Sequence, residues 1–117
     1  MSDGKLSVRT QVLLWAAQRA SAVVLAVCVI VHLVTIIYAV RNGLSAAEIL
    51  GRTRGSAAWA AFYFVFVAAI AVHAAIGLRS VLAESFDWRG KGLDITVAVI
   101  GVALALWGFR AVYAVFV

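Results

Sequence analysis

The sequence has no proline and one cysteine, and charged residues make up only 13% of its 117 positions. A single cysteine excludes an intrachain disulfide, and Cys28 lies within an apolar run, where it suits close packing. A chain this short cannot hide 66% hydrophobic residues inside a soluble core. The composition therefore excludes an ordinary soluble domain and indicates a membrane protein.

Several functional signatures are also missing. There is no glycine-rich nucleotide loop and no nucleophile–base pair, so we expect no catalysis by this chain alone. Its ten lysines and arginines form no basic stripe interleaved with aromatic residues, which argues against nucleic acid and indicates anionic lipid. The apolar runs contain no acidic residue, inverted repeat or broken helix. These absences argue against a small proton-coupled transporter, the least favoured alternative.

Three apolar runs are each long enough to cross about 30 Å of hydrocarbon. They predict an all-α integral membrane protein with one domain, 1–117, and transmembrane helices at about 20–40, 57–78 and 95–117. The connections set the orientation, because positive charge concentrates on the inner side of a membrane. With the amino end inside, that side carries Lys5, Arg9, Arg19, Arg79, Arg89 and Lys91, against Arg41, Arg52, Arg54 and Arg110 outside. The excess favours an inner amino end.

Local signals refine the helices. Ser45 and Glu48 have the spacing of a capping box, which predicts a short surface helix between the first two spans. Asp94 is the expected N-cap of the third span. Gly101 and Gly108 within that span are candidates for close helix contact.

Two histidines lie at membrane depth, where an ionisable side chain is costly and therefore marks a functional site. His32 belongs to a stripe at helical spacing on the first span: Gln18, Ser21, Leu25, Cys28 and His32. A polar stripe on a membrane helix should face protein or cofactor, so we expect this face to point away from lipid.

His73, in the second span, stands among small residues. On a helix, Ala69 and Gly77 lie one turn to either side on the same face, which leaves room for a flat macrocycle. Arg79 lies about 9 Å further along the axis, within reach of an anionic group such as a haem propionate. The alternative is a core histidine that only hydrogen-bonds to a neighbouring helix.

The two imidazoles are predicted to lie at different depths. If Arg19 and Arg79 mark the same interface, the histidines differ in depth by roughly 10 Å. Axial ligands of one haem lie on opposite sides of a single iron, so His32 and His73 should not share it. The same separation disfavours a single ordinary metal ion. Each histidine would then need a partner histidine from another chain.

Two segments resemble motifs of the cytochrome b membrane anchors of succinate dehydrogenase and fumarate reductase. His73-x-x-x-Gly77-x-Arg79, followed by Glu84, is similar to the haem motif of the family's second helix. Gln18-Arg19-Ala20-Ser21, which opens the first span, is similar to its quinone-site motif. With the three-helix layout, the resemblance covers nearly the whole chain.

The resemblance implies a haem b-binding anchor that forms half of a larger helix bundle and passes electrons between an iron–sulfur subunit and membrane quinone. His73 would be an axial ligand of the haem iron, and Arg79 would lie near the propionates. The quinone site would comprise Trp15, Gln18, Arg19 and Ser21, with Arg19 stabilising negative charge on the reduced quinone. Trp15 stands where some members have a serine.

Two interpretations of His32 remain open. Its surroundings, residues 29–33, are similar to the setting of the first-helix ligand in two-haem members, whereas single-haem anchors lack a ligand at this depth. His32 is therefore either an axial ligand of a second, outer haem or a hydrogen-bonded structural histidine.

The resemblance also implies partners: a flavoprotein subunit, an iron–sulfur subunit, and a second anchor chain or a copy of this one. It implies a bacterial-type inner membrane, with the amino end in the cytoplasm and the carboxyl end outside. Glu84-Ser85 stands where one anchor type has Asp-Tyr, so the partner anchor would supply that tyrosine. A haem-free structural anchor of the same complex is the alternative function.

Overall fold

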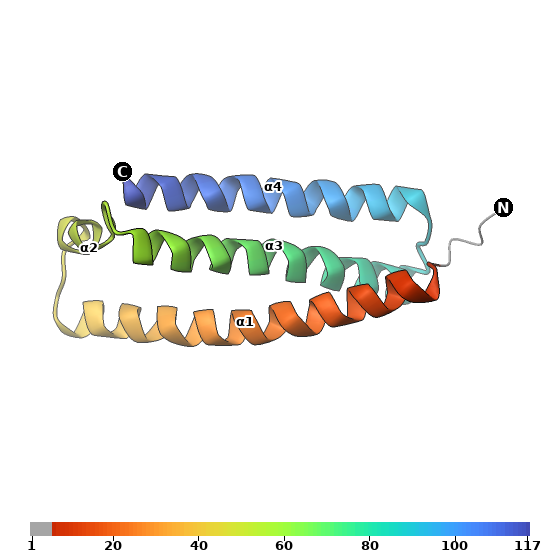
Figure 1. Cartoon of the computed structure of the whole chain (residues 1–117), viewed down its shortest axis with the longest axis horizontal. Coiled ribbons are helices and arrows are strands. Elements are labelled where there is room, and N and C mark those ends of the chain that lie inside the picture. Colours follow the sequence, from red (N-terminus) through yellow and green to blue (C-terminus); the bar gives the residue numbers. More distant parts are fainter. Residues whose placement is uncertain (1–5) are drawn as a thin grey trace.

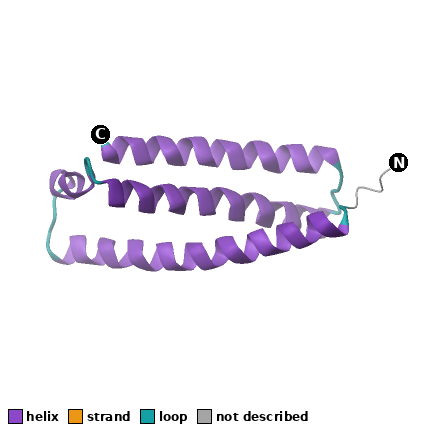
Figure 2. Cartoon of the chain, viewed as in Figure 1, coloured by secondary structure: helices purple, strands orange, loops and turns teal. Residues whose placement is uncertain are grey.

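The fold is described by a computed structural model for residues 6–117. Within this range three long helices lie side by side, and a short fourth helix sits at one end of them (Figure 1). Loops and turns are short compared with the helices (Figure 2), and the described residues include no strand. The helices are α1 (Val8–Arg41), α2 (Ala46–Thr53), α3 (Ala57–Phe86) and α4 (Lys91–Phe116). This confirms the predicted all-α fold with three helices able to cross a membrane.

The long helices extend past the predicted spans, most of all α1. Its 34 residues correspond to about 50 Å at 1.5 Å per residue, well beyond the roughly 30 Å of a bilayer's hydrocarbon. The extra turns lie at the amino end, where the Ser7 side chain accepts a hydrogen bond from the Thr10 backbone amide. Hydropathy marks where the membrane ends, whereas the helix continues until it is capped.

The α2 end of the molecule is tied together by backbone acceptors. The predicted capping signal is confirmed, because the Ser45 hydroxyl accepts from the Glu48 amide and starts α2. After α2, the Thr53 hydroxyl donates to the Val115 carbonyl at 2.8 Å. The Gly55 amide donates to the Phe116 carbonyl, also at 2.8 Å. These bonds satisfy the last carbonyls of α4, which have no partner within the helix.

The turn between α3 and α4 corrects one prediction. The N-cap of α4 is Gly90, and Asp94 lies within the first helical turn, so the expectation that Asp94 caps this helix was wrong. Asp87 ends α3 with φ 50°, and Gly90 follows with φ 104°, a value that favours glycine. The helix begins earlier than hydropathy suggests because the turn is tight, and Asp94 is free to contact α3.

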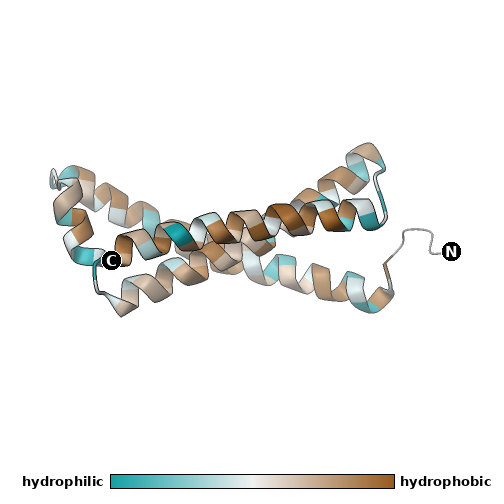
Figure 3. Cartoon of the chain, turned by 90° about the horizontal axis from the view of Figure 1, so that it is seen from above, coloured by the Kyte–Doolittle hydropathy of each residue, from teal (hydrophilic) through white to brown (hydrophobic). Residues whose placement is uncertain are grey.

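The central helix, α3, packs against α4 on one side and α1 on the other (Figure 1). On the α4 side, a Cβ at Gly101 would lie 3.1 Å from the Ala75 Cβ, and one at Gly108 would collide with Val67. Both glycines therefore allow close helix contact, as predicted. Apolar residues predominate along the long helices (Figure 3), and many of their large side chains are exposed, which suits contact with lipid or with other apolar helices.

Candidate functional site

His73 reaches across the α1–α3 interface to Ser21. Its Nδ1 nitrogen lies 3.3 Å from the Ser21 Oγ. Ser21 is 7% exposed, and it is the one polar side chain classed as buried among residues 6–117. The same hydroxyl donates to the Gln18 carbonyl at 3.0 Å. Ser21 and Cys28 are the buried residues of α1, which confirms that the predicted stripe faces protein.

Gln18 occupies the space beside Gly77. A Cβ added to Gly77 would lie 3.2 Å from the Gln18 Nε2. The expectation of open room on that side of His73 was therefore wrong, because the amide from α1 fills it. Gln18 Oε1 is buried and has no hydrogen-bond partner within the described part of the chain. A buried acceptor without a partner costs about 1–3 kcal/mol, which marks this position as unusual.

Two cavities flank Gln18 near the amino end of α1. One has a volume of about 280 Å³, and its lining includes Trp15, Gln18 and Arg79. The other has about 300 Å³ and is lined by Trp15, Gln18, Arg19 and Ala22. The Arg19 guanidinium lies over the Trp15 ring, 5.2 Å from its centroid. The structure thus brings the predicted quinone-site residues together, except Ser21, whose hydroxyl is turned toward His73.

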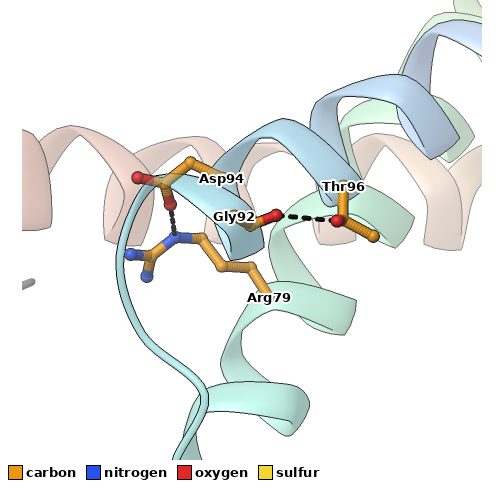
Figure 4. Close-up of polar contacts among 4 residues, drawn as sticks. All are labelled: Arg79, Gly92, Asp94 and Thr96. Atoms are coloured by element: carbon orange, nitrogen blue, oxygen red, sulfur yellow. Dashed lines mark hydrogen bonds and ion pairs between the residues drawn. The ribbon is translucent and has the colours of Figure 1, made fainter.

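Arg79 is paired with Asp94, which the sequence had predicted to be the N-cap of the third span. Its Nε donates to Asp94 Oδ1 at 2.8 Å, and the two side chains are 18% and 43% exposed. Figure 4 shows the arginine reaching from α3 to the first turn of α4, where the Thr96 hydroxyl also bonds the Gly92 carbonyl. The nearness of Arg79 and Asp94 to one tight turn is the signal that could have suggested this pair.

His32 forms a second contact between α1 and α3, far from the first. Its Nδ1 lies 3.3 Å from the Tyr63 hydroxyl, and its ring meets Tyr63 and Phe66 edge to face. Ser21 and His32 are eleven residues apart on α1, and Tyr63 and His73 are ten apart on α3. At 1.5 Å per residue the imidazoles are therefore about 15 Å apart along the bundle. One iron cannot bind both.

The surroundings of His32 are apolar and spacious. Two cavities, of about 340 Å³ and 310 Å³, both include His32, Thr53 and Tyr63 in their linings. Among residues 6–117 no group of three histidine, cysteine or acidic side chains lies close enough to hold a metal ion. Tyr63 is not among the site residues predicted from the sequence, and its contact with His32 is found only in the structure.

The comparisons with known proteins identify the family. A sequence model of the succinate dehydrogenase/fumarate reductase transmembrane subunit matches residues 3–117. The chain belongs to this family. It is therefore a membrane subunit of a succinate dehydrogenase or fumarate reductase complex, and it works with the other subunits of that complex. Comparisons with curated proteins and with solved structures give no significant match.

In this membrane subunit the residues predicted to carry function fall into two groups. Trp15, Gln18, Arg19, Ser21, His73 and Arg79 gather where the amino end of α1 meets the carboxyl half of α3. His32 lies beside Tyr63, toward the other end of the helices. The roles of these residues stay predictions. The first group combines charged and polar side chains, whereas His32 and Tyr63 lie beside largely apolar cavities.

Proposed function

We propose that this subunit binds haem b through His73 and passes electrons between an iron–sulfur subunit and membrane quinone. The observation that carries the proposal is the setting of His73. Its Nδ1 faces the Ser21 hydroxyl, and its Nε2 has no hydrogen-bond partner among the described residues. An imidazole with one nitrogen held and the other free suits an axial haem ligand.

A second protein ligand to the haem would come from outside this chain. His32 lies about 15 Å from His73 along the bundle, by the rise of an α-helix. We therefore propose that a second anchor chain, or a copy of this one, supplies the opposing histidine and completes the helix bundle. The exposed apolar faces of α1 and α4 leave room for such helices.

The charges near His73 support the same assignment. When bound, haem b supplies a one-electron carrier whose potential depends on its axial ligands, burial and nearby charges. Arg79 uses its Nε for Asp94, so its terminal nitrogens remain to bind a propionate. Asp94 offsets part of the positive charge of Arg79 at this point.

We assign the cavities beside Gln18 to the quinone. Trp15 and Gln18 line both cavities, and Arg19 lines one. The guanidinium of Arg19 would stabilise negative charge on a reduced quinone oxygen. By position along the helices, this site lies at the end of the bundle that would face the iron–sulfur subunit, with the flavoprotein subunit beyond it. The amino end would then lie on the cytoplasmic side of a bacterial-type inner membrane.

A second haem at His32 is the other candidate that an observation favours. His32 repeats the pattern of His73, with Nδ1 beside a hydroxyl of α3 and Nε2 unpaired among residues 6–117. The cavities around it give space for a ligand. If it binds no haem, His32 holds α1 to α3 as a structural histidine.

The test is a reduced-minus-oxidised spectrum with haem-to-protein stoichiometry, on the native complex and on His73→Ala and His32→Ala. We expect His73→Ala to lose a b-type band. Loss of a further band in His32→Ala would establish two haems, and an unchanged spectrum would make His32 structural. A native complex without any b-type band would refute haem binding and leave the haem-free anchor.

A further inference from the structure

We propose that Ser21 is a positioning residue for His73. Its hydroxyl accepts a hydrogen bond from Nδ1–H and thereby fixes the tautomer in which Nε2 carries the free lone pair. The inference rests on the proposed function, in which Nε2 is the atom that binds the haem iron. It moves Ser21 from the quinone site, where the family resemblance put it, to the support of the haem ligand.

The protons available at Ser21 and His73 decide which atom donates. A serine hydroxyl has one proton to donate and two lone pairs that accept. The Ser21 proton is directed to the Gln18 carbonyl, one helical turn earlier, at 3.0 Å. Only lone pairs then remain on the side facing His73 Nδ1, 3.3 Å away. Both contacts of the hydroxyl are satisfied together only when Nδ1 carries the proton, so this arrangement puts the lone pair of the ring on Nε2.

Burial makes this preference strong. Ser21 is 7% exposed, and unpaired polar groups in such surroundings are costly. In the opposite tautomer the Ser21 proton would have to turn to Nδ1, and the hydroxyl would lose its bond to the Gln18 carbonyl. In the preferred arrangement, hydrogen bonds run in one direction from Nδ1–H to the Ser21 hydroxyl and on to the Gln18 carbonyl. Each bond polarises the next, so the hydroxyl relays the pull of a backbone carbonyl to the imidazole.

This chain of hydrogen bonds changes the basicity of the His73 imidazole as well as its orientation. A hydrogen bond accepted from the distal N–H of a metal-binding histidine raises the basicity of the other nitrogen. A more basic Nε2 favours ferric over ferrous iron, so the bond lowers the midpoint potential of the haem. Removal of the Ser21 hydroxyl should therefore raise the potential and weaken haem retention.

The experiment compares Ser21→Val with Ser21→Thr in the whole complex. The two side chains have nearly the same shape, but only threonine keeps a hydroxyl that can bond the preceding turn. Cys28→Ala is the matched control, because Cys28 is the other buried residue of α1 and lies two turns along the same face. Midpoint potential and haem-to-protein ratio are measured for each.

We expect Ser21→Val to shift the one-electron reduction equilibrium about tenfold toward ferrous haem, which is roughly 59 mV. Haem affinity should fall by about 10- to 100-fold, as for other losses of a hydrogen bond to a metal ligand. Ser21→Thr and Cys28→Ala should keep the native potential. Should the valine variant fail to assemble, Ser21→Ala removes the hydroxyl without added bulk and is measured in the same way.

Two results would overturn the inference. Equal shifts in Ser21→Val and Ser21→Thr would show that size at the interface matters and the hydroxyl does not. A native potential and haem content in Ser21→Val or Ser21→Ala would show that His73 needs no such partner. Neither result touches the haem assignment itself, which fails separately if His73→Ala keeps its b-type band.

Discussion

The two sides of α3 differ in what holds them together. Toward α4, the Arg79–Asp94 pair lies near the connecting turn, and contact along the rest of the interface depends on shape. Gly101 and Gly108 admit side chains of α3, and Phe64 stacks on Phe109 with ring centroids 4.7 Å apart. Toward α1, the contacts include two hydrogen bonds that join a histidine to a hydroxyl. The two cavities beside Gln18 also lie along α1.

We infer from this difference that the α3–α4 interface is a scaffold and that the α1–α3 interface holds the candidate site. Small residues let two membrane helices approach until their atoms interlock, and such an interface has little freedom. The α1–α3 interface instead leaves Gln18 Oε1 without a partner among the described residues and keeps space around His32. We infer that the α3–α4 pair fixes the position of His73 while the α1 side provides its chemistry.

The largest expected effect on stability comes from a bulky substitution at the α3–α4 interface. Gly108→Leu would force a side chain into Val67, and overpacking of this kind costs about 1–3 kcal/mol or more. We expect a clear loss of assembled complex, measured as yield and thermal stability in mild detergent. Gly51→Ala is the control, because a Cβ at Gly51 meets nothing within 4 Å. Equal yields from both variants would contradict the tight interface.

A smaller effect is expected where the scaffold meets the site. Asp94→Asn removes the carboxylate that pairs with Arg79, and such a partly exposed pair contributes about 0–1 kcal/mol to stability. The uncompensated arginine should raise the haem midpoint potential with little change in assembly, which redox titration would detect. Asp87→Asn breaks the exposed pair with Arg89 and should leave the potential unchanged. An unchanged potential in Asp94→Asn would argue against a haem propionate near Arg79.

The smallest change in stability is expected at the α1 side. Gly77→Ala places a Cβ 3.2 Å from Gln18 Nε2, so the amide must move by a few tenths of an ångström. The better helix propensity of alanine, worth up to about 1 kcal/mol, offsets this crowding. We expect nearly native stability and a raised KM for quinone. Gly92→Ala, where the nearest atom is 3.7 Å away, is the control. A native KM would place the quinone away from Gln18.

Sequence patterns predicted the parts of the fold that depend on one helix at a time. Apolar runs located the three long helices, and helical spacing correctly turned the Ser21–Cys28 face toward protein. The glycines of α4 were also correctly expected at close contacts. Periodicity states which residues share a face, and that was enough for these features.

Features that depend on two helices at once were missed. Gln18 fills the space at Gly77 because of the register between α1 and α3, which no single-helix pattern specifies. Asp94 pairs with Arg79 because a tight turn brings the two helix ends together. Tyr63 meets His32 for the same reason of register. The haem and quinone roles themselves rest on the family resemblance and await the experiments above.

The turn at residues 87–90 also bears on how the subunit is built during biogenesis. Closing a short loop loses less chain entropy than closing the longer connection, residues 42–56, that joins α1 to α3. We infer that α3 pairs with α4 more readily than with α1. If His73 binds haem as proposed, the α3–α4 hairpin would hold His73 in position and contact with α1 would add Ser21 beside the imidazole.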